Sequence, residues 1–372
     1  MNAILATSAR HIMTVSRKNN MLTYKSFPGL NDEVALDLHS ECIKDLMSLT
    51  SDQAETQNED LLAAAIILRF HEEVDAPQRE DTEDSELFLH VTNQFLNGQY
   101  PFTPHIPHSS PLITHSGLAN DHEIAQSSLM LPETLRPSQP GGLRQAAFWV
   151  AFRQEIYASF LKQRPFSIPL SHCEGFRRVT PAEDAVWADR MVVFCADVLV
   201  YCYGGVDSSP SQDQAHWEHL KSLESSWTEI TPTSFTPIYH KHPNANLGEV
   251  LPEIWYLSDC HVTGIQHLEL ARMLLAMHNP SHQRSGPGAF TRAKALGKEL
   301  RAIVLRLCGI ALGNKGMDPA AVTASLGIAL CGDYFEDRAD QNAVLGVLEE
   351  VNRSHGWNVS RTIESLKQAW DW

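Results

Sequence analysis

The sequence predicts an all-α protein in which several helices are joined by long irregular loops. Apolar residues recur at helical spacing in one segment after another, and proline or glycine stands at the ends of these segments. No segment shows the sustained alternation of apolar and polar residues that marks a half-buried strand. We therefore expect no sheet of consequence and no alternation of strands with helices.

The first 75 residues contain three predicted helices. The first begins directly after Met1, at an apolar segment that reads NAILATSARHIM. Asn31 and Asn58 are suitable N-cap residues, because each is followed by two acidic residues that interact favourably with a helix N-terminus. The helix after Asn31 is expected to end near Leu49. The segment after Asn58, LLAAAIILRFHEEV, has a continuous apolar run that predicts a buried helix.

Residues 76–142 are predicted to form an irregular connection between two parts of a helical core. The segment opens with an acidic loop, DAPQREDTEDSE, which a short helical stretch, LFLHVTNQFLNG, follows. Seven prolines with many serine and histidine residues then occur between Tyr100 and Gly141. Such a composition shows little periodicity and favours a loop.

A predicted helix between Gly141 and Pro165 is the one around which we expect the other helices to pack. Its apolar side chains cover more than half of the circumference, an arc too wide for a surface helix. The arc holds Leu143, Ala146, Ala147, Trp149, Val150, Ala151, Ile156, Tyr157, Ala158, Phe160 and Leu161. The other side holds Arg144, Gln145, Glu155, Ser159, Lys162 and Gln163, with Phe148 and Phe152 among them.

Arg153 interrupts the apolar arc of this helix, one turn from Trp149 and one turn from Tyr157. A buried guanidinium needs a carboxylate partner and is expected to stack on these rings. One interpretation is a buried ion pair that fixes the helix register. The candidate partners in other predicted helices are Glu72, Glu73 and Glu269. The other interpretation is that Arg153 binds the carboxylate or phosphate of a small effector in a cavity between helices.

Helix signals continue to the C-terminus. Thr180-Pro181-Ala182-Glu183 has the pattern of a capping box with proline at the first helical position, and Asp318-Pro319 places an N-cap before a first-turn proline. Gly356 is the expected residue after a helix C-terminus. The predicted helices span approximately 180–203, 212–228, 252–277, 290–313, 318–337, 339–355 and 360–372. A loop at 231–248 and a flexible break at 285–288 separate some of them.

Composition and charge describe an acidic globular protein. The chain has 372 residues, of which 45 are acidic and 29 are basic, and its net charge is −16. This charge repels a phosphate backbone, so we expect the chain not to bind nucleic acid by itself. The sequence has no run of eighteen apolar residues and no signal-peptide pattern, so we expect neither a membrane-spanning helix nor export. Seven scattered cysteines without a C-x-x-C pair are expected to be reduced.

No sequence motif indicates a catalytic, cofactor or metal site. A phosphate-binding glycine loop, G-x-S-x-G and H-E-x-x-H are all absent. The acidic runs REDTEDSE and GDYFEDRAD lie at loop or helix-end positions and do not supply the facing carboxylates of a terpene-type cyclase. Three histidine pairs are expected to be solvated rather than metal-bound: His105 with His108, His216 with His219, and His240 with His242. We therefore expect no catalytic, cofactor or metal-binding residue and no enzymatic activity.

Five segments taken together resemble one protein family. They read NAILATSARHI, LLAAAIILRFHEEVDAP, GLRQAAFWVAFRQEIY, LCGIALGN and CGDYFEDRADQNAVLGVLEEVNRSHGWNV with a later LKQAW. In this order they resemble the fungal-specific transcription factor domain, and in particular the proteins labelled ARCA-like. This is the regulatory domain that follows a Zn₂Cys₆ DNA-binding cluster in fungal regulators. The resemblance covers nearly the whole chain.

The resemblance implies one helical regulatory domain over residues 1–372, with a core of residues 1–75 and 143–372. It implies a nuclear regulator of metabolic or secondary-metabolite gene clusters, with partners in the transcription machinery and homodimer formation in many relatives. A small-molecule effector, the second interpretation of Arg153, is a further candidate partner. Without the resemblance, we would expect a cytoplasmic location. The zinc cluster is absent from the sequence, so we expect no direct, specific DNA binding.

Two forms of such a regulator remain open: the regulatory part of a longer protein, or a stand-alone relative without the DNA-reading part. The alternatives to a regulator are an interaction scaffold unconnected with transcription and, third, a helical enzyme.

Overall fold

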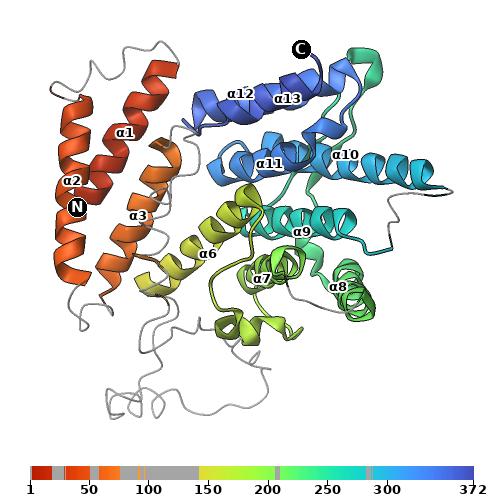
Figure 1. Ribbon diagram of the computed structural model, residues 1–372, viewed down its shortest axis with the longest axis horizontal. Helices are drawn as coiled ribbons and strands as arrows, with labels where there is room; N and C mark the ends of the chain where they lie inside the picture. The colour runs from red at the N-terminus through yellow and green to blue at the C-terminus, as the bar shows by residue number, and fades with distance from the viewer. Residues whose placement is uncertain are drawn as a thin grey trace, which may run out of the picture.

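The computed structural model describes residues 2–18, 29, 31–50, 58–75, 91, 92, 96, 142–205, 210–281, 286 and 288–372. These residues form a mostly helical protein, which confirms the predicted fold class (Figure 1). Within them, strands are limited to one sheet of two short strands. The connection predicted at 76–142 lies outside the described residues, apart from 91, 92, 96 and 142.

Three helices near the N-terminus pack against one another (Figure 1). They are α1 (Asn2–Lys18), α2 (Asp32–Thr50) and α3 (Glu59–Asp75). The two predicted N-caps are confirmed. Asn31 Oδ1 accepts a hydrogen bond from the Val34 N–H at 2.8 Å, and Asn58 Oδ1 accepts one from the Asp60 N–H at 3.0 Å. Each cap satisfies a backbone donor that has no partner within its own helix.

The helix predicted between Gly141 and Pro165 is α6 (Leu143–Lys162). It connects the two parts of the molecule, because it packs against α3 and also against α7 (Asp184–Tyr203) and α11 (Asp318–Cys331) (Figure 1). It is not the most deeply buried helix. That helix is α9 (Asp259–Met277), which buries 14 of its 19 residues, whereas α6 buries 9 of 20. Four helices pack against α9: α7, α8 (Pro210–Ile230), α10 (Ala289–Gly313) and α11.

The contact between α7 and α9 depends on a close approach of their backbones at Gly264. A Cβ atom at this position would lie 2.9 Å from the Ala188 Cα and 3.0 Å from the Met191 Sδ. Both distances are shorter than ordinary van der Waals contacts, so the packing leaves no space for a larger residue.

Four helices complete the chain after α9. They are α10 (Ala289–Gly313), α11, α12 (Arg338–Ser354) and α13 (Ser360–Ala369). In Figure 1, α9, α11 and α12 lie in successive layers, and α11 packs against both neighbours. Asp337 caps α12, since its Oδ1 accepts a hydrogen bond from the Ala339 N–H at 2.8 Å. Gly356 follows α12 with a φ of +67°, as expected for the glycine after a helix C-terminus.

The segment between α8 (Pro210–Ile230) and α9 differs from the prediction. We expected Pro252 to begin a long helix, but it precedes β2 (Glu253–Trp255), which pairs antiparallel with β1 (Tyr239–Lys241). The Asn314 side chain at the end of α10 donates a hydrogen bond to the Ile254 carbonyl at 3.0 Å. A tertiary contact thus overrides the helical pattern. In the described part of the chain there are also four 3₁₀ turns: η5 (Leu170–Arg177), η6 (Thr233–Phe235), η7 (Ala245–Leu247) and η8 (Gly332–Tyr334).

The capping box predicted at Thr180 is also wrong, because α7 begins only at Asp184. Two oxygen atoms of Thr180, the carbonyl and the hydroxyl, accept hydrogen bonds from the Arg190 guanidinium at 2.7 and 3.2 Å. Arg190 is buried, and its guanidinium lies 4.6 Å above the Trp187 ring. Thr180 therefore satisfies a buried cation one to two turns inside α7 instead of capping the helix.

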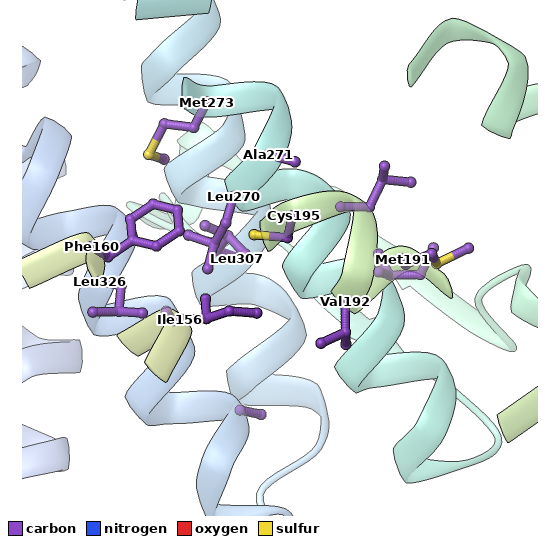
Figure 2. Packing of buried hydrophobic residues seen from close by; sticks show 14 of the residues in the cluster. Ile156, Phe160, Met191, Val192, Cys195, Leu270, Ala271, Met273, Leu307 and Leu326 are labelled. Atoms are coloured by element: carbon purple, nitrogen blue, oxygen red, sulfur yellow. The ribbon is translucent and has the colours of Figure 1, made fainter. Parts of the chain in front are cut away.

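One apolar cluster extends from α3 through α6, α7, α9, α10 and α11 to α12. Figure 2 shows part of this cluster, including Phe160 of α6, Cys195 of α7, Leu270 of α9, Leu307 of α10 and Leu326 of α11. All seven cysteines are free, as predicted. Among the described helices, none has the length and apolarity needed to cross a lipid bilayer.

Candidate functional site

A cavity of about 600 Å³ lies between α6, α7, α9 and α11. Phe70 of α3, His11 of α1 and Trp357, which follows α12, complete its wall. Most of the wall is apolar, and its apolar members include Val150, Ile156, Ala185, Ala188, Met317, Val322 and Leu326. This volume falls within the range of small-molecule sites in proteins.

Arg153 lies in the wall of this cavity and is half-buried. Among the described residues, no carboxylate lies within 4.0 Å of its guanidinium, and no aromatic ring stacks on it. Burial lowers the pKa of Arg153, and the negative charge of Asp189 partly opposes that effect. Arg153 is also the one arginine or lysine among the described wall residues.

The two aromatic residues predicted beside Arg153 have different positions. Trp149 packs away from the cavity, and its ring meets that of Phe176 edge-on with centroids 5.1 Å apart. Tyr157 lines the cavity, and its hydroxyl accepts a hydrogen bond from the Trp357 Nε1–H. The structure therefore brings Arg153 and Tyr157 to one site and leaves Trp149 outside it.

None of the predicted carboxylate partners is seen paired with Arg153. Glu269 is bound by Arg272 at 2.8 Å and by Arg306 at 3.1 Å. Glu72 does not form an ion pair with Arg153 among the described residues, and the side chain of Glu73 lies outside them. Glu269 is unsuited to the role because two arginines from α9 and α10 already neutralise it.

Asp189 is the acidic residue whose charge acts on Arg153. It lies on α7 in the cavity wall, and burial raises its pKa to about 7 even though the charge of Arg153 lowers it. Near neutral pH, a large fraction of Asp189 is therefore uncharged. A carboxyl group in this state does not neutralise Arg153 completely.

His267 gives the wall a neutral hydrogen-bond acceptor. Its side chain is buried, and burial lowers its pKa to about 4, so the ring is uncharged at neutral pH. Nδ1 lies 2.7 Å from the Thr263 carbonyl and must donate to it, which leaves the lone pair on Nε2. Among the described residues, Nε2 has no hydrogen-bond partner. A water or a ligand hydroxyl would satisfy it.

The buried charge of α6 is Glu155, which the sequence analysis placed on the polar side of the helix. Its side chain is 0% exposed. Glu155 Oε1 accepts hydrogen bonds from Arg164 at 2.6 Å, from the Ser167 N–H at 3.0 Å and from the Ser167 hydroxyl at 2.7 Å. Arg69 of α3 lies 3.8 Å from its other oxygen. We call these four residues the Glu155 cluster; they hold the end of α6 to the following loop and to α3.

The helical arc predicted for α6 was therefore partly wrong. Phe148 and Phe152, which we placed among the polar residues, are 0% exposed, whereas Leu143 and Leu161 of the expected apolar arc are 46% and 49% exposed. Because α6 has neighbours on several sides, the angular distribution of its apolar residues does not identify the buried face.

One further polar cluster in the described part of the chain consists of Asp184, Ser234 and His261. Ser234 and His261 both bind Asp184, each at 2.8 Å, so the carboxylate stands between them. A nucleophilic triad needs the serine bonded to the histidine. No group of three or more metal-binding side chains occurs among the described residues.

Two of the three predicted histidine pairs lie in the described part of the chain. His216 packs on Tyr201, and His240 packs on His242 with ring centroids 4.4 Å apart. His105 and His108 lie outside the described residues.

Sequence reasoning found Arg153 but missed Asp189 and His267. The signal was present, because each is a titratable residue within a largely apolar helix, as Arg153 is. What the sequence does not contain is the convergence of α6, α7 and α9 on one cavity, which only the packing creates.

Comparisons of the chain with models of known protein families, with curated proteins and with solved structures found no match.

Proposed function

We propose that this chain is a ligand-responsive regulatory domain of a fungal transcription regulator. The observation that carries the proposal is the cavity between α6, α7, α9 and α11, with Arg153 in its wall and no carboxylate paired to it among the described residues. A cavity at the junction of four helices is suited to signalling, because an occupant contacts each helix and biases how they pack.

The resemblance of five segments to the fungal-specific transcription factor domain supports this proposal, and so does the all-helical architecture that it implies. The regulator would act in the nucleus on metabolic or secondary-metabolite genes. Its partners would be proteins of the transcription machinery and a second copy of the chain. A separate DNA-reading part would supply the specificity.

Direct DNA binding is not part of this role. With a net charge of −16, the chain should bind duplex DNA more weakly than about 10⁻⁶ M at physiological salt. A gel-shift assay with random and genomic duplexes measures this. Sub-micromolar binding that depends on the sequence of the duplex would contradict the proposal.

A reporter experiment tests the regulatory role. The whole chain is fused to an unrelated DNA-binding domain in a fungal host, and transcription is measured from a promoter that carries the matching operator. We expect the fusion to change transcription at least several-fold relative to the DNA-binding domain alone. Transcription that stays unchanged under every growth condition and carbon source tried would contradict the role.

A protein-interaction scaffold is the second candidate. Exposed apolar side chains on and next to the β1–β2 hairpin favour it: Ile238 is 59% exposed, Leu247 73% and Leu257 72%. Large exposed apolar side chains of this kind often mark a protein contact. If Ile238→Ser and Leu257→Ser remove the recovery of specific partners from cell extract while the reporter stays silent, the scaffold function is favoured.

A helical enzyme is the third candidate. Asp189, with its pKa raised to about 7 in a cavity, resembles a general acid or base. Among the described wall residues, however, no metal cluster accompanies it.

A further inference from the structure

We propose that the cavity binds a small monocarboxylic acid with an apolar body, and that the carboxylate binds Arg153. The inference deepens the proposed function and rests on its first part, that the cavity takes a small molecule. It names the chemistry of that molecule.

The anionic group follows from Arg153. A half-buried guanidinium gains most from a carboxylate or phosphate, which can accept two parallel hydrogen bonds from it. Among the described residues, no side-chain carboxylate lies within ion-pair distance, although Asp189 stands in the same wall. An anionic ligand would therefore complete a pair that the protein itself leaves open.

A single negative charge follows from the rest of the wall. Three aspartates line the cavity against one arginine: Asp189 on α7, Asp259 on α9 and Asp318 on α11. Asp318 is 75% exposed and lies 3.4 Å from His355, so its charge faces solvent near the cavity. A phosphate monoester or a dicarboxylate would place a second negative charge among these carboxylates without a second arginine or lysine in the described wall.

An apolar body follows from the remaining surface. Phe70, Ile156, Val322, Leu326 and Trp357 come from four different parts of the chain and form part of the apolar wall of the same cavity. Apolar surface removed from water supplies most of the affinity of such a ligand, and the single ion pair fixes its orientation.

His267 lies in the cavity wall but adds no charge to it. As a neutral acceptor it neither attracts the carboxylate nor competes with Arg153 for it. The polar end of the ligand is therefore expected at Arg153 and not at α9.

Calorimetric titration of the whole chain with four probes of equal length tests the inference. The probes are decanoate, decanol, decylammonium and the dicarboxylate decanedioate. We expect decanoate to bind at least tenfold more tightly than each of the other three. Tighter binding of decylammonium or decanedioate, or no binding of decanoate, would overturn the inference.

Two variants locate the carboxylate. Arg153→Met should weaken decanoate binding at least tenfold and leave decanol binding unchanged, because only the ion pair is lost. Arg361→Met removes the same charge from an exposed position on α13 and should change neither affinity. Equal decanoate affinities of wild type and Arg153→Met would overturn the inference. Circular dichroism establishes that each variant is folded, and Arg153→Lys, which keeps the charge, should retain part of the affinity.

The titration tests the chemistry of the ligand and the reporter experiment tests the role in transcription, so a negative result in one does not imply a negative result in the other. If the reporter responds while decanoate does not bind, the regulatory role stands and the monocarboxylate inference is wrong. If decanoate binds through Arg153 while the reporter is silent, the ligand site stands and the role in transcription is wrong.

Discussion

Two charged residues of α6, two positions apart, differ in their burial and in their bonded partners. Glu155 is 0% exposed and accepts hydrogen bonds from Arg164 and Ser167. Arg153 is half-buried in a cavity wall and has no carboxylate within 4.0 Å among the described residues. We call the Glu155 cluster the closed site, because its carboxylate is paired within the fold. We call the cavity wall around Arg153 the open site, because no carboxylate is paired with it among the described residues.

This difference separates a structural charge from one that is available to a ligand. Taking a charge out of water is costly, and hydrogen-bonded partners offset that cost. Glu155 has its partners within the fold, and its hydrogen bonds and ion pairs hold α6 in place. Arg153 lacks a bonded partner among the described residues, so an anion that binds there can form an ion pair that the fold does not provide.

The largest expected effect is at the closed site. Glu155→Gln removes the buried negative charge that Arg164 and Arg69 contact, and we expect the free energy of unfolding to fall by about 3–5 kcal/mol. Urea denaturation followed by circular dichroism measures it. Glu174→Gln is the control, because Glu174 forms an exposed pair with Arg177 and should cost at most about 1 kcal/mol. Equal losses for both variants would contradict a structural role for the Glu155 cluster.

The next effect concerns the rigidity of the cavity wall. Gly264→Ala places a Cβ atom 2.9 Å from the Ala188 Cα, so we expect a loss of about 1–3 kcal/mol from forced separation of α7 and α9. Gly346→Ala in α12 has open space around it and should instead gain up to about 1 kcal/mol from helix propensity. Urea denaturation of both variants checks the sign. A stabilised Gly264→Ala would show that the two helices do not pack as described.

Asp189 gives the open site a pH dependence. Burial raises its pKa to about 7, far above that of an unfolded aspartate, so the folded state holds a proton that the unfolded state releases. Its contribution to stability is therefore lost as the pH rises from about 4 to 7, and levels off above 7.

We expect Asp189→Asn to match wild type near pH 4 and to exceed it by at least about 1 kcal/mol above pH 7, since one pKa unit corresponds to about 1.4 kcal/mol. Urea denaturation across this pH range measures the difference. Asp259→Asn, at an exposed position on α9, should show no comparable trend. A difference that is constant with pH would contradict an uncharged Asp189.

The smallest expected effect is that of Arg153→Met on stability. Because no bonded carboxylate is left behind among the described residues, the free energy of unfolding should change by less than about 1 kcal/mol in the absence of ligand. Denaturation of wild type and variant in the same buffer decides it. A loss as large as that of Glu155→Gln would mean that Arg153 has a structural partner after all.

The sequence predicted several local features, although the N-cap expected at Asp318 is wrong because Met317 holds that position. The structure confirms that α6 ends before Pro165, at Lys162, that α10 ends at Gly313 and that Asn31 and Asn58 cap their helices. All of them depend on residues next to one another. These features follow from backbone conformation and from hydrogen bonds within one helical turn.

Features that depend on distant residues were missed. Thr180 is bound by Arg190, and Pro252 precedes a strand held by Asn314, so both depart from the local rule. The burial of Glu155 depends on Arg164 and on Arg69 from another helix. Spacing along the chain contains no information on such partners, and for the same reason it could identify Arg153 but not the cavity.

One thermal denaturation experiment tests the difference between the two charges of α6 most directly. Wild type, Arg153→Met and Glu155→Gln are melted with and without decanoate at about 100 times its dissociation constant, where binding adds about 2.7 kcal/mol of stability. We predict that Glu155→Gln melts lower than wild type but is still stabilised by decanoate, by several degrees. Arg153→Met should melt like wild type without ligand and gain at most about half as much stability from decanoate, because a tenfold weaker affinity leaves about 1.4 kcal/mol at this concentration. Equal stabilisation of wild type and Arg153→Met by decanoate would contradict the assignment of Arg153 to the ligand.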